Sequence, residues 1–144
     1  MKRKGYILLL VSAYLILIGG IADIAMTFYI PSLPQQHLAY LQMNDYAVPP
    51  ALKNLDHFLL RAIGGCLIGI GIGALTLIYT SLKNNSKNII WGLLGMITIS
   101  EGINALQLVQ LHSLYFIFPF ICVILSWIGA MLWWYRNKEE SKQI

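Results

Sequence analysis

Three charged residues interrupt the long apolar stretches of this 144-residue sequence, and they are the residues best suited to chemistry. Asp23, Arg61 and Glu101 each lie within a different run of mostly hydrophobic residues. A charge at the centre of a bilayer costs on the order of 3 kcal/mol on insertion scales, so such residues are rare and are candidates for function. One guanidinium can hold two carboxylates through its planar fork. We therefore expect Arg61 to pair with Asp23, with Glu101 or with both.

Two amides extend this polar set along the third apolar run. Asn104 and Gln107 follow Glu101 at spacings that keep all three in one sector of a helix. The predicted ligand-binding pocket therefore contains Asp23, Arg61, Glu101, Asn104 and Gln107. Two carboxylates outnumber one cation, so a proton, a bound cation or a ligand donor has to complete the cluster. Three roles stay open: fixing the register of the helices, binding a ligand, or conducting protons or ions.

The elements that carry these residues are four apolar segments, each long enough to span a bilayer. A spanning helix needs about 20 mostly apolar residues, and its backbone has to bond to itself in hydrocarbon. Hydrophobic residues make up 58% of the chain and charged residues 11%, against about 45–50% and about 25% in soluble domains. We predict one domain over 1–144, an all-α integral membrane protein with an antiparallel four-helix bundle. The predicted spans cover residues 6–30, 58–80, 89–111 and 114–135.

The basic residues predict the orientation of these spans. Eight of the ten Lys and Arg residues flank the chain termini or the link between the second and third spans. Cytoplasmic loops carry such an excess, so both termini are expected in the cytoplasm, most simply at a bacterial inner membrane. The lipid bilayer is then the expected partner, and the net charge of +4 requires no nucleic acid to explain it.

The long connection over residues 31–57 is predicted to lie outside. It contains four of the five prolines. Two interpretations are open for it: a connector bounded by prolines, or a connection that contains a short interfacial helix within residues 35–44. His37, His57 and His112 with Asp56 have spacings that match no zinc pattern, so we predict no metal site. No motif identifies a cofactor.

Glycine recurs at every fourth position of the second span. Gly65, Gly69 and Gly73 form a small-xxx-small series, with Gly64 and Gly71 beside it. Small residues let helices approach closely in membranes. Two partners are open for this series: the first helix of the same chain, or a second copy in a homo-oligomer.

Cys66, Cys122 and Trp127 all lie at depth within predicted spans. No Cys-x-x-Cys pair exists, so both cysteines are expected to act as small buried hydrophobes rather than as a redox pair. Trp127 lies too deep to be an interfacial anchor, and we expect it to line the interior.

The stretch Asn54–Gly73, NLDHFLLRAIGGCLIGIGIG, resembles the Arg-Ala-x-Gly-Gly entry to the second helix of DoxX-like four-helix membrane proteins. That resemblance implies a four-helix bundle and no particular reaction. A fainter likeness connects the chain to the EXPERA group, which includes sterol isomerase and sigma-2-type proteins, through Asp23, Pro49–Pro50 and Pro119. It implies acids in an intramembrane cavity that bind cationic amphiphiles or stabilise carbocations.

The leading functional prediction is the binding of a small amphipathic or lipid-like ligand in the outer half of the bilayer. The chain would act alone or as an accessory subunit of a larger membrane complex. One alternative is a membrane enzyme of the isomerase or oxidoreductase type on a lipid-soluble substrate, with Glu101 or Asp23 as general acid. Another is a small transporter, although no inverted repeat is evident across the four spans.

Overall fold

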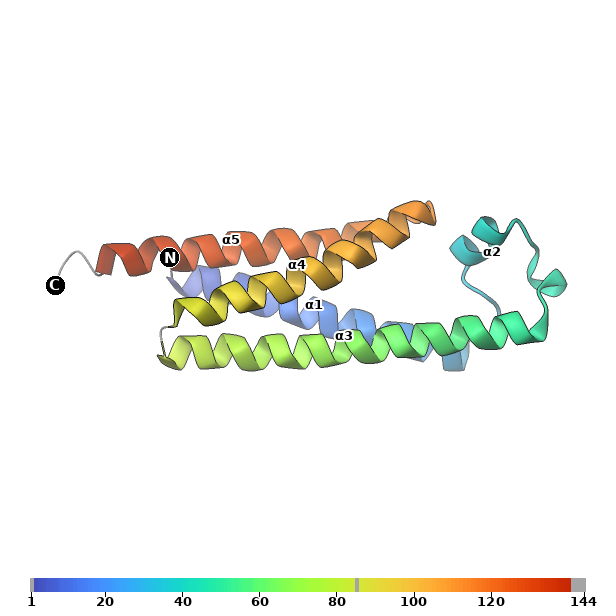
Figure 1. The fold of residues 1–144 in the computed structure, drawn as a ribbon, viewed down its shortest axis with the longest axis horizontal. Helices are drawn as coiled ribbons and strands as arrows, with labels where there is room; N and C mark the ends of the chain where they lie inside the picture. Colours follow the sequence, from blue (N-terminus) through green and yellow to red (C-terminus); the bar gives the residue numbers. More distant parts are fainter. Residues whose placement is uncertain (1, 85, 141–144) are drawn as a thin grey trace.

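The computed structural model describes residues 2–84 and 86–140, and four long helices dominate it (Figure 1). No strand occurs in these two ranges. Successive long helices run in opposite directions. We call the end where α1 begins, α3 meets α4 and α5 finishes the basic end, and the opposite end the loop end. The long helices are α1 (Lys2–Tyr29), α3 (Pro50–Asn84), α4 (Lys87–Gln110) and α5 (Ile117–Glu140), and the short elements are α2 (Gln35–Leu41), η1 (Asp45–Ala47) and η2 (Leu114–Phe116).

All four long helices are long and apolar enough to cross a membrane. The prediction of an all-helical chain with four such segments is confirmed. The candidate spans within the described residues are Lys4–Tyr29, Pro50–Ser81, Asn88–Gln110 and Leu114–Trp134.

The second long helix begins inside the segment expected to be loop. α3 starts at Pro50, whereas the predicted span starts at residue 58. Proline suits the first position of a helix because its fixed φ is already helical and its missing N–H has no partner there in any case. The Pro49 carbonyl accepts the backbone N–H groups of Leu52 and Lys53, at 3.0 and 3.2 Å. The proline pair therefore starts the helix rather than ending the loop.

The long helices form a ring in which α1 and α4 are diagonally opposite. α1 packs along α3 and α5, and α4 packs against α5 and α3. Side chains that point into this ring are almost fully buried, so a polar group on the inner side of α1 or α4 faces the middle of the bundle. The buried core includes Leu9, Ala13, Ile16, Ile78, Leu93, Ile97 and Trp133.

Glycine sets the close approach of α1 to both of its neighbours. A β-carbon added to Gly20 of α1 would lie 2.6 Å from the carbonyl oxygen of Gly64 on α3. At the basic end, a β-carbon on Gly5 would lie 2.6 Å from the carbonyl oxygen of Gly129 on α5. These are backbone atoms, which cannot move aside cheaply, so each contact requires glycine.

The predicted glycine series does not make these contacts. A β-carbon on Gly65, Gly69 or Gly73 would meet nothing within 4 Å. Gly64 and Gly71 face α1 instead, so packing of the series against the first helix is wrong. Neighbouring residues on a helix point about 100° apart, so when Gly64 faces α1 the adjacent Gly65 points elsewhere.

The connection between α1 and α3 folds back on the start of α3. Of the two interpretations of this connection, the one with a short helix within residues 35–44 is confirmed, and the helix is α2, which lies beyond the loop end of the bundle (Figure 1). On α2, the His37 Nδ1 lies 2.6 Å from the Asp56 Oδ1 of α3. This contact connects α2, in the loop, to the second turn of α3, which carries Asp56.

Asp45 makes a second connection between the loop and α3. Its carboxylate accepts the backbone N–H of Leu33 at 3.1 Å and the Lys53 ammonium at 2.7 Å. The hydrogen bond from Lys53, followed by the one from Leu33, holds the pKa of Asp45 below its ordinary value. The Leu33 side chain is buried beside this contact.

Candidate functional site

Glu101 lies in the middle of the bundle, on the side of α4 that faces the ring interior. Only 3% of the residue is exposed. Its Oε1 atom is buried and has no hydrogen-bond partner among residues 2–84 and 86–140. A buried carboxylate oxygen without a partner costs free energy, because it has lost water and gained nothing in return. Asp56 Oδ2 and Ser81 Oγ are also buried without a partner, but Asp56 contacts His37 through its other oxygen and Ser81 carries no charge. Glu101 is therefore the buried acid that most requires an additional group.

Three side chains from three helices surround Glu101. Asp23 of α1 is half-buried and lies within electrostatic range of the Glu101 carboxyl. Asn104, one turn further along α4, interacts with the same carboxyl through its side chain. Cys122 of α5 is buried and also within electrostatic range of Glu101. The structure thus brings together three of the five predicted pocket residues, and adds a cysteine that we had expected only to fill space.

Two buried serines continue the polar interior between α1 and α5. The Ser12 hydroxyl donates to the Cys122 carbonyl oxygen at 2.8 Å and lies 2.8 Å from the Ser126 hydroxyl. The Ser126 hydroxyl lies 2.9 Å from the same carbonyl oxygen and donates its one proton either to that oxygen or to Ser12. Both serines are completely buried. No signal in the sequence shows that these two serines bond to each other.

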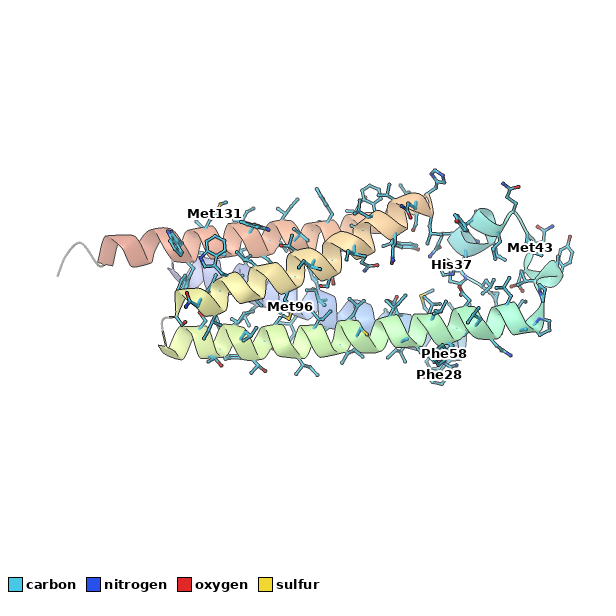
Figure 2. All side chains as sticks on the ribbon, in the orientation of Figure 1. Phe28, His37, Met43, Phe58, Met96 and Met131 are labelled. Atoms are coloured by element: carbon cyan, nitrogen blue, oxygen red, sulfur yellow. The ribbon has the colours of Figure 1, made fainter. Side chains whose placement is uncertain are left out.

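Arg61 does not join the acids. Within the described residues, its guanidinium forms no ion pair with Asp23 or Glu101. Instead, its Nε donates to the Thr27 hydroxyl at 2.8 Å, and its Cζ lies 4.5 Å from the centre of the Phe28 ring. Figure 2 shows Phe28 projecting on the side of the molecule away from α4 and α5. The expected ion pair is therefore wrong, because a long exposed side chain on α3 reaches outward.

Three further residues that were expected to face the interior of the bundle lie away from it. Gln107 is exposed, so the polar sector of α4 is only partly inward-facing. Cys66 is exposed, unlike the buried cysteine expected at this position. Trp127 lines an outer groove between α4 and α5 instead of the interior, and its indole N–H donates to Thr98 at 3.1 Å.

Among residues 2–84 and 86–140, no three His, Cys, Asp or Glu side chains come together as a metal site. Comparison of the chain with models of protein families, with curated proteins and with solved structures finds no match. The site therefore has to be interpreted from its own geometry.

The interior site has an acidic character. Two carboxyl groups, Asp23 and Glu101, share it with an amide, and no described cation is paired with either of them. Such an arrangement can accept hydrogen bonds from an ammonium or hydroxyl group. Asp23 and Asn104 are half-buried whereas Glu101 is buried, so Asp23 and Asn104 are the more accessible members of the site.

Proposed function

We propose that this chain is an integral membrane protein that binds a small amphipathic or lipid-like molecule inside its helix bundle. The polar head of that molecule, a cation or a hydrogen-bond donor, meets Glu101 and Asp23. Its apolar part lies among the aliphatic side chains of the helices. Both termini are cytoplasmic in this proposal, and the site lies in the outer half of a bacterial inner membrane.

One observation carries the proposal: the buried and unpartnered Oε1 of Glu101. Native proteins satisfy nearly all buried polar atoms, and each exception needs an explanation such as an additional bound group. A role in bracing the bundle does not supply that explanation, because a brace would use both carboxylate oxygens. A ligand that donates a hydrogen bond does.

The exposed apolar surface supports the membrane part of the proposal. Large hydrophobic side chains on every long helix are more than half exposed, including Ile18, Ile72, Ile99 and Phe118. Soluble monomers rarely expose contiguous apolar patches beyond a few hundred Å². Hydrocarbon is the solvent in which this surface is favourable. The excess of basic residues at the basic end supports cytoplasmic termini.

The first test is a thermal-shift measurement on the purified protein in dodecyl maltoside. Octylamine is compared with octanol, which has the same chain but no positive charge. A ligand that binds only the folded state at about 100 times its Kd stabilises that state by about 2.7 kcal/mol. We expect octylamine to raise the Tm of the wild type in a saturable way, and octanol to do so less.

Glu101→Gln is the decisive variant, because it keeps the size of the side chain, removes its charge and replaces one acceptor oxygen by an NH2 donor. We expect it to fold, by size exclusion, and to lose the octylamine shift. Gln107→Ala changes an exposed residue on the same helix and is expected to keep the shift. An octylamine shift that survives in Glu101→Gln would contradict the proposed site.

A further inference from the structure

A groove of about 280 Å³ lies on the outside of the bundle, and its lining residues are different from those of the interior acidic site. It runs between the first half of α4 and the second half of α5, at the basic end. Its floor consists of buried aliphatic side chains and its rims of exposed aromatic and methionine side chains. Ile90, Leu94 and Ala130 form the floor, and Trp91, Trp127, Met131 and Trp134 form the rims. Figure 2 shows Met131 projecting from α5 away from the other helices.

Contacts between side chains fix the aromatic rims of this groove. The Trp91 ring of α4 meets the Trp127 and Trp134 rings of α5 edge to face, at centroid distances of 6.3 and 5.8 Å. The hydrogen bond from Trp127 to Thr98 ties one of these rings back to α4. The groove is therefore already shaped before anything enters it, which reduces the entropy cost of binding.

Positive charge is concentrated at the same end of the molecule. Within the described residues, seven basic and two acidic residues lie in the terminal and connecting segments there. Lys87 precedes Ile90 by three residues and Arg136 follows Trp134 by two, so their backbones are within about 5 Å of the groove along the helix axes. Basic clusters next to grooves between membrane helices favour anionic lipid head groups.

We propose that this groove is a binding site for one acyl chain of an anionic phospholipid, whose phosphate meets the basic residues at the adjoining ends of α4 and α5. The volume is near the lower end of the range for ligand clefts, about 300–1,000 Å³, and suits a single hydrocarbon chain. The indoles supply the amphipathic surface that tryptophan presents at membrane interfaces. This site is separate from the interior acidic site and does not depend on the function proposed for it.

The test uses the tryptophans themselves as probes. The protein is reconstituted in vesicles of phosphatidylcholine and phosphatidylglycerol, in which either the zwitterionic or the anionic lipid has brominated acyl chains. Bromine quenches indole fluorescence on contact. Three of the four tryptophans line the groove, while Trp133 is 1% exposed in the core and supplies an unquenched background. At equal mole fractions, we expect the brominated anionic lipid to quench more strongly, with a binding preference of about fivefold per basic residue involved.

A matched pair of double variants tests which basic residues cause the preference for the anionic lipid. Lys87→Gln with Arg136→Gln removes two positive charges from α4 and α5 next to the groove. Arg3→Gln with Lys4→Gln removes two from α1, which is diagonally opposite α4. We expect the first variant to lose the preference for the anionic lipid and the second to keep it.

Three results would overturn the inference. The first is equal quenching by the two brominated lipids in the wild type. The second is an equal loss of preference in both double variants, which would indicate a general surface potential. The third is protection of the tryptophans from both lipids together with a dimer in cross-linking, which would show that a second copy fills the groove.

Discussion

At the scale of single residues, the acids and the arginine differ in what surrounds them. Glu101 is buried with one oxygen unpartnered, whereas Arg61 is exposed and bonded to a neighbouring threonine. Both are charged residues in apolar helices, and the sequence presents them in the same way. The two side chains differ in direction: Glu101 points into the ring of helices, whereas Arg61 points away from it.

Arg61→Leu should therefore cost little stability. The change removes a hydrogen bond to Thr27 and a cation–π contact with Phe28, each worth roughly 1 kcal/mol or less at an exposed position. Denaturant titration in detergent measures the free energy of unfolding, and Thr27→Val is the matched control for the hydrogen bond. A loss of about 3–5 kcal/mol would instead indicate a broken buried ion pair, and would mean that Arg61 does reach the acids.

The buried serine pair predicts coupling between α1 and α5. Hydrogen bonds between membrane helices contribute about 0.6 kcal/mol on average. Ser12→Ala and Ser126→Ala should each destabilise the protein by that order, and the double variant should lose less than the sum because the two hydroxyls bond to each other. A double-mutant cycle in detergent measures this. Strict additivity would show that the two side chains act independently.

At the scale of elements, α1 is the helix on which the bundle is built, because it meets α3 and α5 at glycine contacts near opposite ends. The position of α3 therefore depends on which of two adjacent glycines faces α1. Gly64 does so and Gly65 does not.

Gly64→Ala and Gly65→Ala form a matched pair on α3. The added methyl group at Gly64 would lie 2.6 Å from the Gly20 carbonyl oxygen, so the helices would have to separate. Overpacking of this kind costs typically about 1–3 kcal/mol. The methyl group at Gly65 meets nothing and should leave the Tm unchanged or slightly higher. Destabilisation by Gly65→Ala as well would reveal that the small-residue face packs against a second copy.

The loop between α1 and α3 should loosen in acid. The pKa of Asp45 is lowered in the folded state, so its contacts contribute stability that is present above the unfolded pKa of about 3.9 and is lost as the pH falls through the folded value. Limited proteolysis of residues 31–49 with pepsin across this pH range measures the loosening. Asp45→Asn should be cleaved readily already at the higher pH. Equal cleavage of both proteins at every pH would show that this contact does not hold the loop.

At the scale of the whole molecule, the asymmetry of basic residues predicts how the bundle sits in a membrane. The test needs a background free of Cys66 and Cys122, obtained with Cys66→Ala and Cys122→Ala. Asn44→Cys, at an exposed loop position, should then react with an impermeant maleimide added outside. Ser141→Cys, which lies outside the described residues, should react only after permeabilisation. The reverse pattern would invert the proposed orientation and place the acidic site in the inner half.

The four long helices could be predicted from the sequence. Long apolar runs in 6–30, 58–80, 89–111 and 114–135 predict four helices because such segments satisfy their backbone only internally, and the structure has four. Helical phase also brought Asp23, Glu101 and Asn104 to inward faces. The resemblance to DoxX-like and EXPERA proteins stays a prediction.

Which neighbour each residue meets depends on how the helices pack in three dimensions. A step of one residue turns a side chain by about 100°, so Gly64 rather than Gly65 contacts α1. The Arg61 side chain is long and flexible, so the sequence does not show whether it points into the bundle or away from it. In the structure α1 packs on α3, and Arg61 donates to Thr27 of α1. The partner of a buried polar group depends on the rotation and crossing of two helices, which neither helix encodes alone. The acids were therefore predictable as members of a site, and their lack of a cation was not.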